Sequence, residues 1–206
     1  MKLFAEYRIE HLFQERDAKI DSYLKSMSDK SIIAANTCEL ADEIVGRYSI
    51  SCNLEIITEN VEPKVYMVRI PAAALLPEQR MFARESHYEV AAVDYNFGLK
   101  GNSEILKYQP TTYSHWSIEG SVTNSSLIIT IVTRYANLNL NEQTEQFVTN
   151  TIQTAIHKIR QNISNIQADC EKYNSNLRDR VVSVIEETKR RLNITQEQKG
   201  RLNPFK

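Results

Sequence analysis

The chain has 206 residues, of which 42% are hydrophobic and 25% are charged, and its formal net charge at pH 7 is −1. A chain of this length can bury a hydrophobic core. Its near-zero charge argues against a strongly basic nucleic-acid binder and against an acidic tail. Five glycines and five prolines are too few for a disordered or loop-rich chain.

No targeting or redox signal stands out along the chain. Residues 1–13 carry charges among their apolar side chains, so they do not resemble a signal peptide. No apolar segment reaches the roughly 18 residues that a membrane span needs. Cys38, Cys52 and Cys170 lack the spacing of a zinc site, and we expect three buried free thiols. These features predict a cytoplasmic protein without a metal or a cofactor.

Two helices are expected before residue 50. Residues 2–28 place apolar side chains on one face and charged side chains on the other, which predicts a first helix. A shorter helix is expected at 37–45, with Asn36 or Thr37 as its N-cap and Gly46 at its C′ position.

The middle of the chain changes to an alternating pattern, which is typical of half-buried strands. Strands are expected at 48–56, 64–70, 87–97, 104–108, 112–122 and 126–135. A short helix at 77–85 and a turn at 98–102 interrupt them. Because strands that are adjacent in sequence usually pair, we expect an antiparallel meander of five to six strands, with 112–122 and 126–135 as a hairpin.

A long amphipathic helix is predicted at 141–192. Its apolar residues alternate in steps of four and three, which is a heptad rhythm. They are Ile152, Ile156, Ile159, Ile163, Ile166, Cys170, Tyr173 and Leu177. Asn139 with Glu142 forms a candidate capping box, and Asn141 is the alternative cap. The next apolar residue after Leu177 is Val181, so the rhythm contains a stutter there.

The length of this helix suggests that it needs a partner. At about 1.5 Å per residue it would extend roughly 75–80 Å, which exceeds the width of a small domain. We therefore expect the first helix to cover its proximal half, and another chain or a long partner helix to cover its distal half. The predicted self-association residues are Ile152, Ile156, Ile159, Ile163, Ile166, Tyr173 and Leu177.

Together these elements predict an α+β fold. The fold comprises N-terminal helices, an antiparallel sheet of five to six strands and a long C-terminal helix that resembles a coiled-coil strand. The expected divisions are an α+β core at 1–140, the long helix at 141–192 and a tail or linker at 193–206.

No catalytic, cofactor-binding or metal-binding constellation is found. Arg80 and His87 have the Arg-x6-His spacing of the HEPN ribonucleases, but those domains are all-helical and His87 begins a predicted strand. Glu62 and Lys64 have the Glu-x-Lys spacing of restriction-type nucleases, but Pro63 breaks the strand that such a site requires. We interpret Arg80 and His87 as surface residues, and Glu62 and Lys64 as part of a turn.

One dense basic run, Lys189, Arg190 and Arg191, lies near the end of the long helix. Positive charge is favoured at a helix C-terminus, so these residues can form a solvated helix end. The alternative interpretation is a weak nucleic-acid contact.

The C-terminal part of the chain resembles the amino-terminal region of uncharacterised bacterial multidomain proteins. In that family a basic helix leads into a Leu-Gly-Ile-Pro-Leu-Lys type linker, often followed by a restriction-endonuclease-like domain. The matching residues are Asn176, Leu177, Ile185, Lys189, Arg190, Arg191, Leu192, Leu202, Asn203, Pro204, Phe205 and Lys206. The resemblance covers about the last thirty residues. It implies a role in defence against phage, with an effector domain after Lys206 or on a separate chain.

These observations predict a non-catalytic module for self-association and for sensing or regulation in a bacterial defence system. Its expected partner is a second copy, with a dimer favoured, or an effector domain, and no membrane contact is expected. The alternatives are a nucleic-acid-contacting accessory domain of a nuclease and, third, a nuclease of the metal-dependent or HEPN-like kind.

Overall fold

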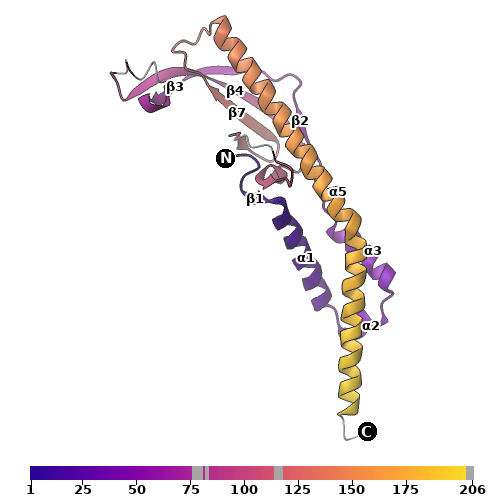
Figure 1. Ribbon diagram of the computed structural model, residues 1–206. Helices are drawn as coiled ribbons and strands as arrows, with labels where there is room; N and C mark the ends of the chain where they lie inside the picture. Colours follow the sequence, from indigo (N-terminus) through magenta and orange to yellow (C-terminus); the bar gives the residue numbers. More distant parts are fainter. Residues whose placement is uncertain (76–80, 82–83, 114–117, 203–206) are drawn as a thin grey trace. The chain divides into compact units, whose positions relative to one another are not determined.

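The computed structural model describes residues 1–75, 81, 84–113 and 118–202, and these have an α+β fold (Figure 1). Its α-helices are α1 (Ile9–Ser26), α2 (Asp29–Ala34), α3 (Thr37–Tyr48) and α5 (Glu142–Arg201). Its strands are β1 (Tyr7–Arg8), β2 (Leu54–Ile57), β3 (Lys64–Pro71), β4 (His87–Gly101), β5 (Tyr108–Gln109), β6 (Ser121–Val122) and β7 (Ser126–Val132). Two 3₁₀-helices, η1 (Ala72–Ala74) and η2 (Ser103–Lys107), complete the described elements.

The chain divides into two compact units, and each combines segments that are distant in sequence. The sheet unit comprises Met1–Tyr7 and Cys52–Ile166, and the helical unit comprises Arg8–Ser51 and Gln167–Lys206. The predicted division at residue 140 does not follow this partition, because α5 contributes residues to both units.

Strand β4 is the centre of the sheet unit. It pairs antiparallel with β3 along its first half and with β2 along its last four residues, and β7 pairs with its opposite edge. β6 then pairs with β7. Because β2 and β3 both pair with β4 rather than with each other, the predicted meander is wrong, although the β6–β7 hairpin is confirmed.

The core of the sheet unit follows the alternation of strand side chains. One face of the sheet buries Val93, Phe97 and Leu99 on β4 together with Leu127, Ile129 and Ile131 on β7. Figure 1 shows the first part of α5 running across this sheet. The stripe residues of that part of α5, from Ile152 to Ile166, are buried as well.

The helical unit consists of α1, α2, α3 and the part of α5 that follows Gln167. Asn36 caps α3, because its side-chain oxygen accepts hydrogen bonds from the backbone of Cys38 and Glu39. Ser28 caps α2 in the same way through Ser31. The core of this unit combines Ile20, Leu24, Leu40, Ala41 and Ile44 with Leu177, Val181 and Ile185.

Polar contacts within the helical unit connect α5 to α1 and α3. The Arg178 Nε atom donates to Asp42 at 2.7 Å, and the two terminal nitrogens of Arg180 donate to Asp17 at 3.0 and 3.2 Å. The Phe13 and Tyr173 rings stack, with their centroids 4.6 Å apart.

The prediction of which elements pack against the long helix is wrong. Its distal half belongs with α1, α2 and α3, whereas we expected α1 beside the proximal half and no partner within the chain for the distal half. Every residue of the heptad stripe, and also Val181 and Ile185 beyond the stutter, has a relative exposure of 7% or less. The chain itself therefore covers the stripe that we expected another chain to cover.

At the start of the chain, the helices also begin or end at residues other than those predicted. Helix α1 begins at Ile9, because backbone hydrogen bonds from Leu3 to Ile118 and from Phe4 to Leu106 hold the first residues against the sheet unit. Helix α2 was not predicted. Gly46 lies inside α3 rather than after it.

Other boundaries differ later in the chain. The strand expected at 48–56 is confined to β2, and the one expected at 104–108 is mostly η2. Strand β4 continues through the predicted turn at 98–102, because β2 pairs with it as far as Gly101. At Gly101 φ is +113°, and a Cβ atom would lie 2.2 Å from the Asn53 carbonyl oxygen, so this position requires glycine.

The cap and the end of α5 are corrected too. Asn141, rather than Asn139, provides the cap, since its Oδ1 atom accepts from the Thr144 backbone at 2.9 Å. The helix continues to Arg201, beyond the end expected at residue 192, so residues 193–201 are helical. The helix predicted at 77–85 falls largely outside the described residues.

Candidate functional site

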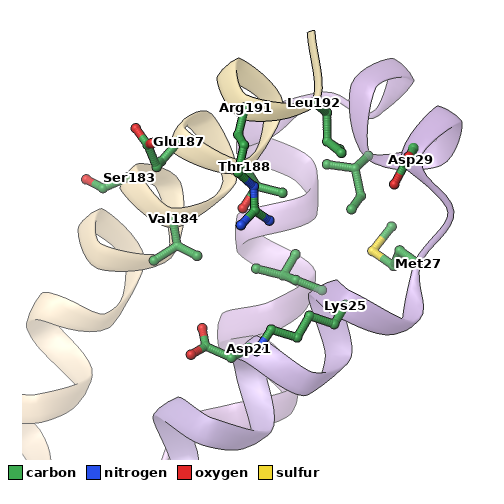
Figure 2. Close-up of a pocket in the computed structure, with 12 residues that line it drawn as sticks. Asp21, Lys25, Met27, Asp29, Ser183, Val184, Glu187, Thr188, Arg191 and Leu192 are labelled. Carbon is green, nitrogen blue, oxygen red and sulfur yellow. The ribbon is translucent and has the colours of Figure 1, made fainter. Parts of the chain in front are cut away.

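A groove in the helical unit is the candidate functional site (Figure 2). Its volume is about 480 Å³, which is within the range of small-ligand sites. Helix α1, the start of α2 and the last third of α5 line it. The lining residues are Asp21, Leu24, Lys25, Met27, Asp29, Ile32, Ser183, Val184, Glu187, Thr188, Arg191 and Leu192.

The groove has an apolar floor. Leu24 and Ile32 are buried, with exposures of 4% and 3%. Val184 is 38% exposed in the same groove, so part of this apolar surface remains in contact with water. The stutter explains this exposure, because Val181 and Ile185 continue the buried stripe and leave Val184 beside it.

Charges of both signs surround that floor. Asp21, Asp29 and Glu187 are the acidic lining residues, and Lys25 and Arg191 are the basic ones. Figure 2 shows the Arg191 guanidinium directed into the groove between α5 and α1, with Asp21 and Lys25 on the facing helix. Arg191 forms no ion pair among the described residues, so its guanidinium is free to bind an anionic group.

A hydrogen-bonded cluster lies next to the groove. The Tyr173 hydroxyl donates to Asp17 Oδ1 at 2.7 Å, and the Arg180 guanidinium lies over the Tyr173 ring at 4.5 Å. Burial, together with the hydrogen bond to Asp17, raises the pKa of Tyr173 to about 12. A smaller cavity of about 240 Å³ is lined by Asp17 and Arg180 of this cluster and by Asp21 and Val184 of the groove.

The structure assigns a different environment to each residue of the basic run. The Lys189 ammonium donates to the Ala35 carbonyl at 2.5 Å and to Thr37 Oγ1 at 3.0 Å. Arg190 forms an ion pair with Glu187 one turn earlier. Arg191 lines the groove. The three charges therefore do not form a single patch.

The seven residues predicted for self-association are side chains of the folded core. Ile152, Ile156, Ile159, Ile163 and Ile166 are buried in the sheet unit, and Tyr173 and Leu177 are buried in the helical unit. Self-association itself stays a prediction.

The structure places three of the four remaining candidate residues. His87 is exposed at the start of β4, and Arg80 lies outside the described residues. Glu62 and Pro63 precede β3, and Lys64 begins it. Among the described residues no three His, Cys, Asp or Glu side chains form a group that could hold a metal ion. No helix within the described ranges is long and apolar enough to span a membrane.

The cysteine prediction is wrong. Cys38 is a free cysteine but is exposed rather than buried. Cys52 and Cys170 are buried, with exposures of 4% and 2%, but they are not free thiols.

The hydroxyl of Ser183, which lines the groove, donates to the backbone carbonyl of Asp179 at 3.0 Å, so a backbone oxygen and not a side-chain base accepts its proton. Sequence reasoning missed the groove because its residues come from 21–32 and 183–192. The available signal was the Asp21–Lys25 and Glu187–Arg191 spacing, which places acid and base one turn apart on each helix.

No protein-family model, curated protein or solved structure matches the chain.

Proposed function

We propose that this chain is a non-catalytic sensing and regulatory module, and that the groove of the helical unit is its ligand site. The observation that supports this most is the combination of an apolar floor with a free guanidinium and nearby carboxylates in one concave surface. Sites with this composition bind ligands through apolar burial and use a few polar groups for orientation.

The arrangement of charges selects a zwitterionic ligand with an apolar side chain. Arg191 can form a bidentate pair with a carboxylate. Asp21 and Asp29 can accept hydrogen bonds from an ammonium group. Leu24, Ile32 and the other apolar residues would contact the side chain of the ligand. An apolar amino acid or a short apolar peptide has all three features, so this is the ligand class that we propose.

The proposal can be tested by NMR titration of the ¹⁵N-labelled chain with L-leucyl-L-leucine. We expect saturable shifts in residues of 21–32 and 183–192. Removal of the ligand carboxylate, in leucyl-leucinamide, should weaken binding about tenfold, because a charge-assisted bidentate pair is lost. Absence of saturable shifts at millimolar dipeptide would contradict the proposal.

Two tryptophan variants provide a matched control. Val184→Trp places a large side chain in the groove and should abolish binding. Glu186→Trp adds the same side chain to an exposed position of α5 that does not line the groove, so binding should be retained. Equal binding to both variants would show that the dipeptide occupies another site.

The wider context of the module also remains a proposal. The resemblance at residues 176–206 supports a place in bacterial antiphage defence, in the cytoplasm, with a second copy or an effector domain as partner. If the chain self-associates, it uses a surface other than the buried stripe. Sedimentation equilibrium measures self-association, and a phage-plating assay on cells with and without the gene tests the defence role.

Within the part of the chain that the structure describes, no contact favours nucleic-acid binding by the basic run over the groove proposal. Lys189 donates to two protein oxygens and Arg190 pairs with Glu187, so Arg191 is the one cation of the basic run without an ion pair or side-chain hydrogen bond to the described residues. Duplex binding that is salt-independent, or that Arg190→Glu leaves unchanged, would reject this alternative.

A further inference from the structure

A second cavity lies within the sheet unit, where α5 crosses the sheet. Its volume is about 410 Å³. It is lined by Thr58, Val61, Tyr95, Phe97, Ile152, Gln153, Ile156, His157 and Arg160. Val61, Tyr95, Phe97, Ile152 and Ile156 make most of the wall apolar or aromatic. The cavity is thus large enough for a small organic ligand and apolar enough to bury its body.

The aromatic wall has a defined position because of the strand alternation. Tyr95 and Phe97 are two residues apart on β4, so their side chains share one face of the sheet. Their rings stack, with centroids 6.2 Å apart and an interplanar angle of 11°. Such a pair provides a rigid, planar surface at low cost in side-chain entropy.

One cation is fixed at this cavity. The Arg160 Nη2 atom donates to the Ile56 carbonyl at 3.4 Å and to Thr58 Oγ1 at 3.1 Å, so the end of β2 holds the guanidinium. Both hydrogen bonds come from Nη2, so the Nε and Nη1 atoms of Arg160 take no part in them. No Asp or Glu is among the described lining residues, so the charge of Arg160 is not compensated within the cavity.

We propose that this cavity binds a small amphipathic monoanion, with an aromatic or apolar body against Tyr95 and Phe97 and a carboxylate bound by Arg160. Charge complementarity selects the anion, because Arg160 is the one Lys, Arg, Asp or Glu among the described lining residues. His157 and Gln153 add polar groups at the same helix face, one turn apart, that can orient the carboxylate.

The test uses 2-naphthoate as the anionic probe and 2-naphthylmethanol and 2-naphthylmethylamine as its neutral and cationic counterparts. Isothermal titration calorimetry with the full chain should give tightest binding for naphthoate and weakest for the amine. Arg160→Gln should reduce naphthoate affinity about tenfold while changing affinity for the alcohol little, as expected for loss of one charge-assisted contact. Arg160→Lys should restore part of the affinity.

Three variants locate the binding. Val61→Trp, which fills the cavity from its partly exposed loop, should abolish binding of all three probes. Arg134→Gln, at an exposed arginine of the same unit, and Arg191→Gln, in the groove of the helical unit, should leave naphthoate binding unchanged. Circular dichroism verifies that each variant is folded.

Three results would overturn the inference: no naphthoate binding at millimolar concentration, equal affinity for the three probes, or an Arg160→Gln variant that binds naphthoate as the parent chain does. Because Arg191→Gln and the dipeptide titration report on the other unit, failure here would be distinguishable from failure of the proposed groove function.

Discussion

At the scale of the residue, Asp17 accepts hydrogen bonds from two side chains of α5 in the helical unit. It accepts the Tyr173 hydroxyl and a bidentate pair of hydrogen bonds from Arg180. The Tyr173 ring stacks on Phe13 at the same time. The cluster therefore attaches α5 to α1 through aromatic packing and through charge-assisted hydrogen bonds.

The tyrosine hydroxyl gives a pH-dependent prediction. Since the folded pKa of Tyr173 is about 12 and the ordinary value is 10.0, the unfolded chain loses this proton first as the pH rises. The contribution of the group to stability is therefore complete below pH 10 and is lost between pH 10 and about 12. Tyr173→Phe keeps the ring and should cost about 1 kcal/mol near neutral pH.

Urea unfolding from neutral to alkaline pH checks this prediction. The difference in stability between the parent chain and Tyr173→Phe should decrease above pH 10. Tyr48→Phe, at a tyrosine for which no hydroxyl hydrogen bond is described, serves as a control and should cost less near neutral pH. A difference for Tyr173→Phe that grows with pH would contradict the assigned hydrogen bond.

Substitution of Ile163 tests whether the buried stripe of α5 stabilises the single chain. Its exposure is 5%, so Ile163→Asp places an unpaired carboxylate in the core of the sheet unit. We expect a loss of about 3 kcal/mol or more in unfolding free energy, measured by urea denaturation of dilute protein. Gln161→Asp, an exposed position on the same helix, should change stability by less than about 0.5 kcal/mol.

Measuring the stability of Ile163→Asp at several protein concentrations distinguishes a role in core packing from a role in self-association. If the effect of Ile163→Asp is independent of protein concentration, the residue stabilises the single chain. A variant that is as stable as the parent chain but has lost self-association would contradict the burial described above.

At the scale of the element, the start of α5 depends on one side chain. Asn141 Oδ1 accepts from the Thr144 backbone, whereas Asn137 is the side chain that accepts from Asn139. Asn141→Ala should therefore cost about 1 kcal/mol of stability, as expected for loss of an N-cap, and Asn139→Ala should cost less. Thermal unfolding of the two variants measures the difference, and a larger effect at Asn139 would favour the capping box instead.

Prediction from the sequence was most successful where the signal is local. Periodicity predicted the α+β class and strand β3, and capping preferences gave Asn36 as one of two candidate caps of α3. The heptad rhythm also predicted correctly which residues of α5 are buried. Periodicity does not identify what buries them, because a stripe packs equally well on a sheet, on helices of the same chain or on another chain.

The features that could not be predicted depend on contacts between distant segments. Pairing of β2 and β3 with the same edge of β4 leaves no trace in either strand alone. The same holds for the two candidate sites. Arg191 lines the groove together with residues of α1 and α2, and the end of β2 accepts the hydrogen bonds of Arg160.

At the scale of the whole molecule, two units with different cores share one helix in sequence. The stripe of α5 contributes Ile152–Ile166 to the sheet unit and Cys170–Ile185 to the helical unit, and all the stripe residues are buried. Each unit contains one candidate site, and the charged residues that line the two sites differ. The groove of the helical unit suits a zwitterion, and the cavity of the sheet unit suits an anion.

The most direct measurement of the central claim is the NMR titration of the full chain with L-leucyl-L-leucine, run in parallel on Val184→Trp and Glu186→Trp. Sensing by the groove predicts saturable shifts confined to residues 21–32 and 183–192 in the parent chain and in Glu186→Trp, and none in Val184→Trp. No saturable shift at millimolar dipeptide, or the same shifts in both tryptophan variants, would contradict it.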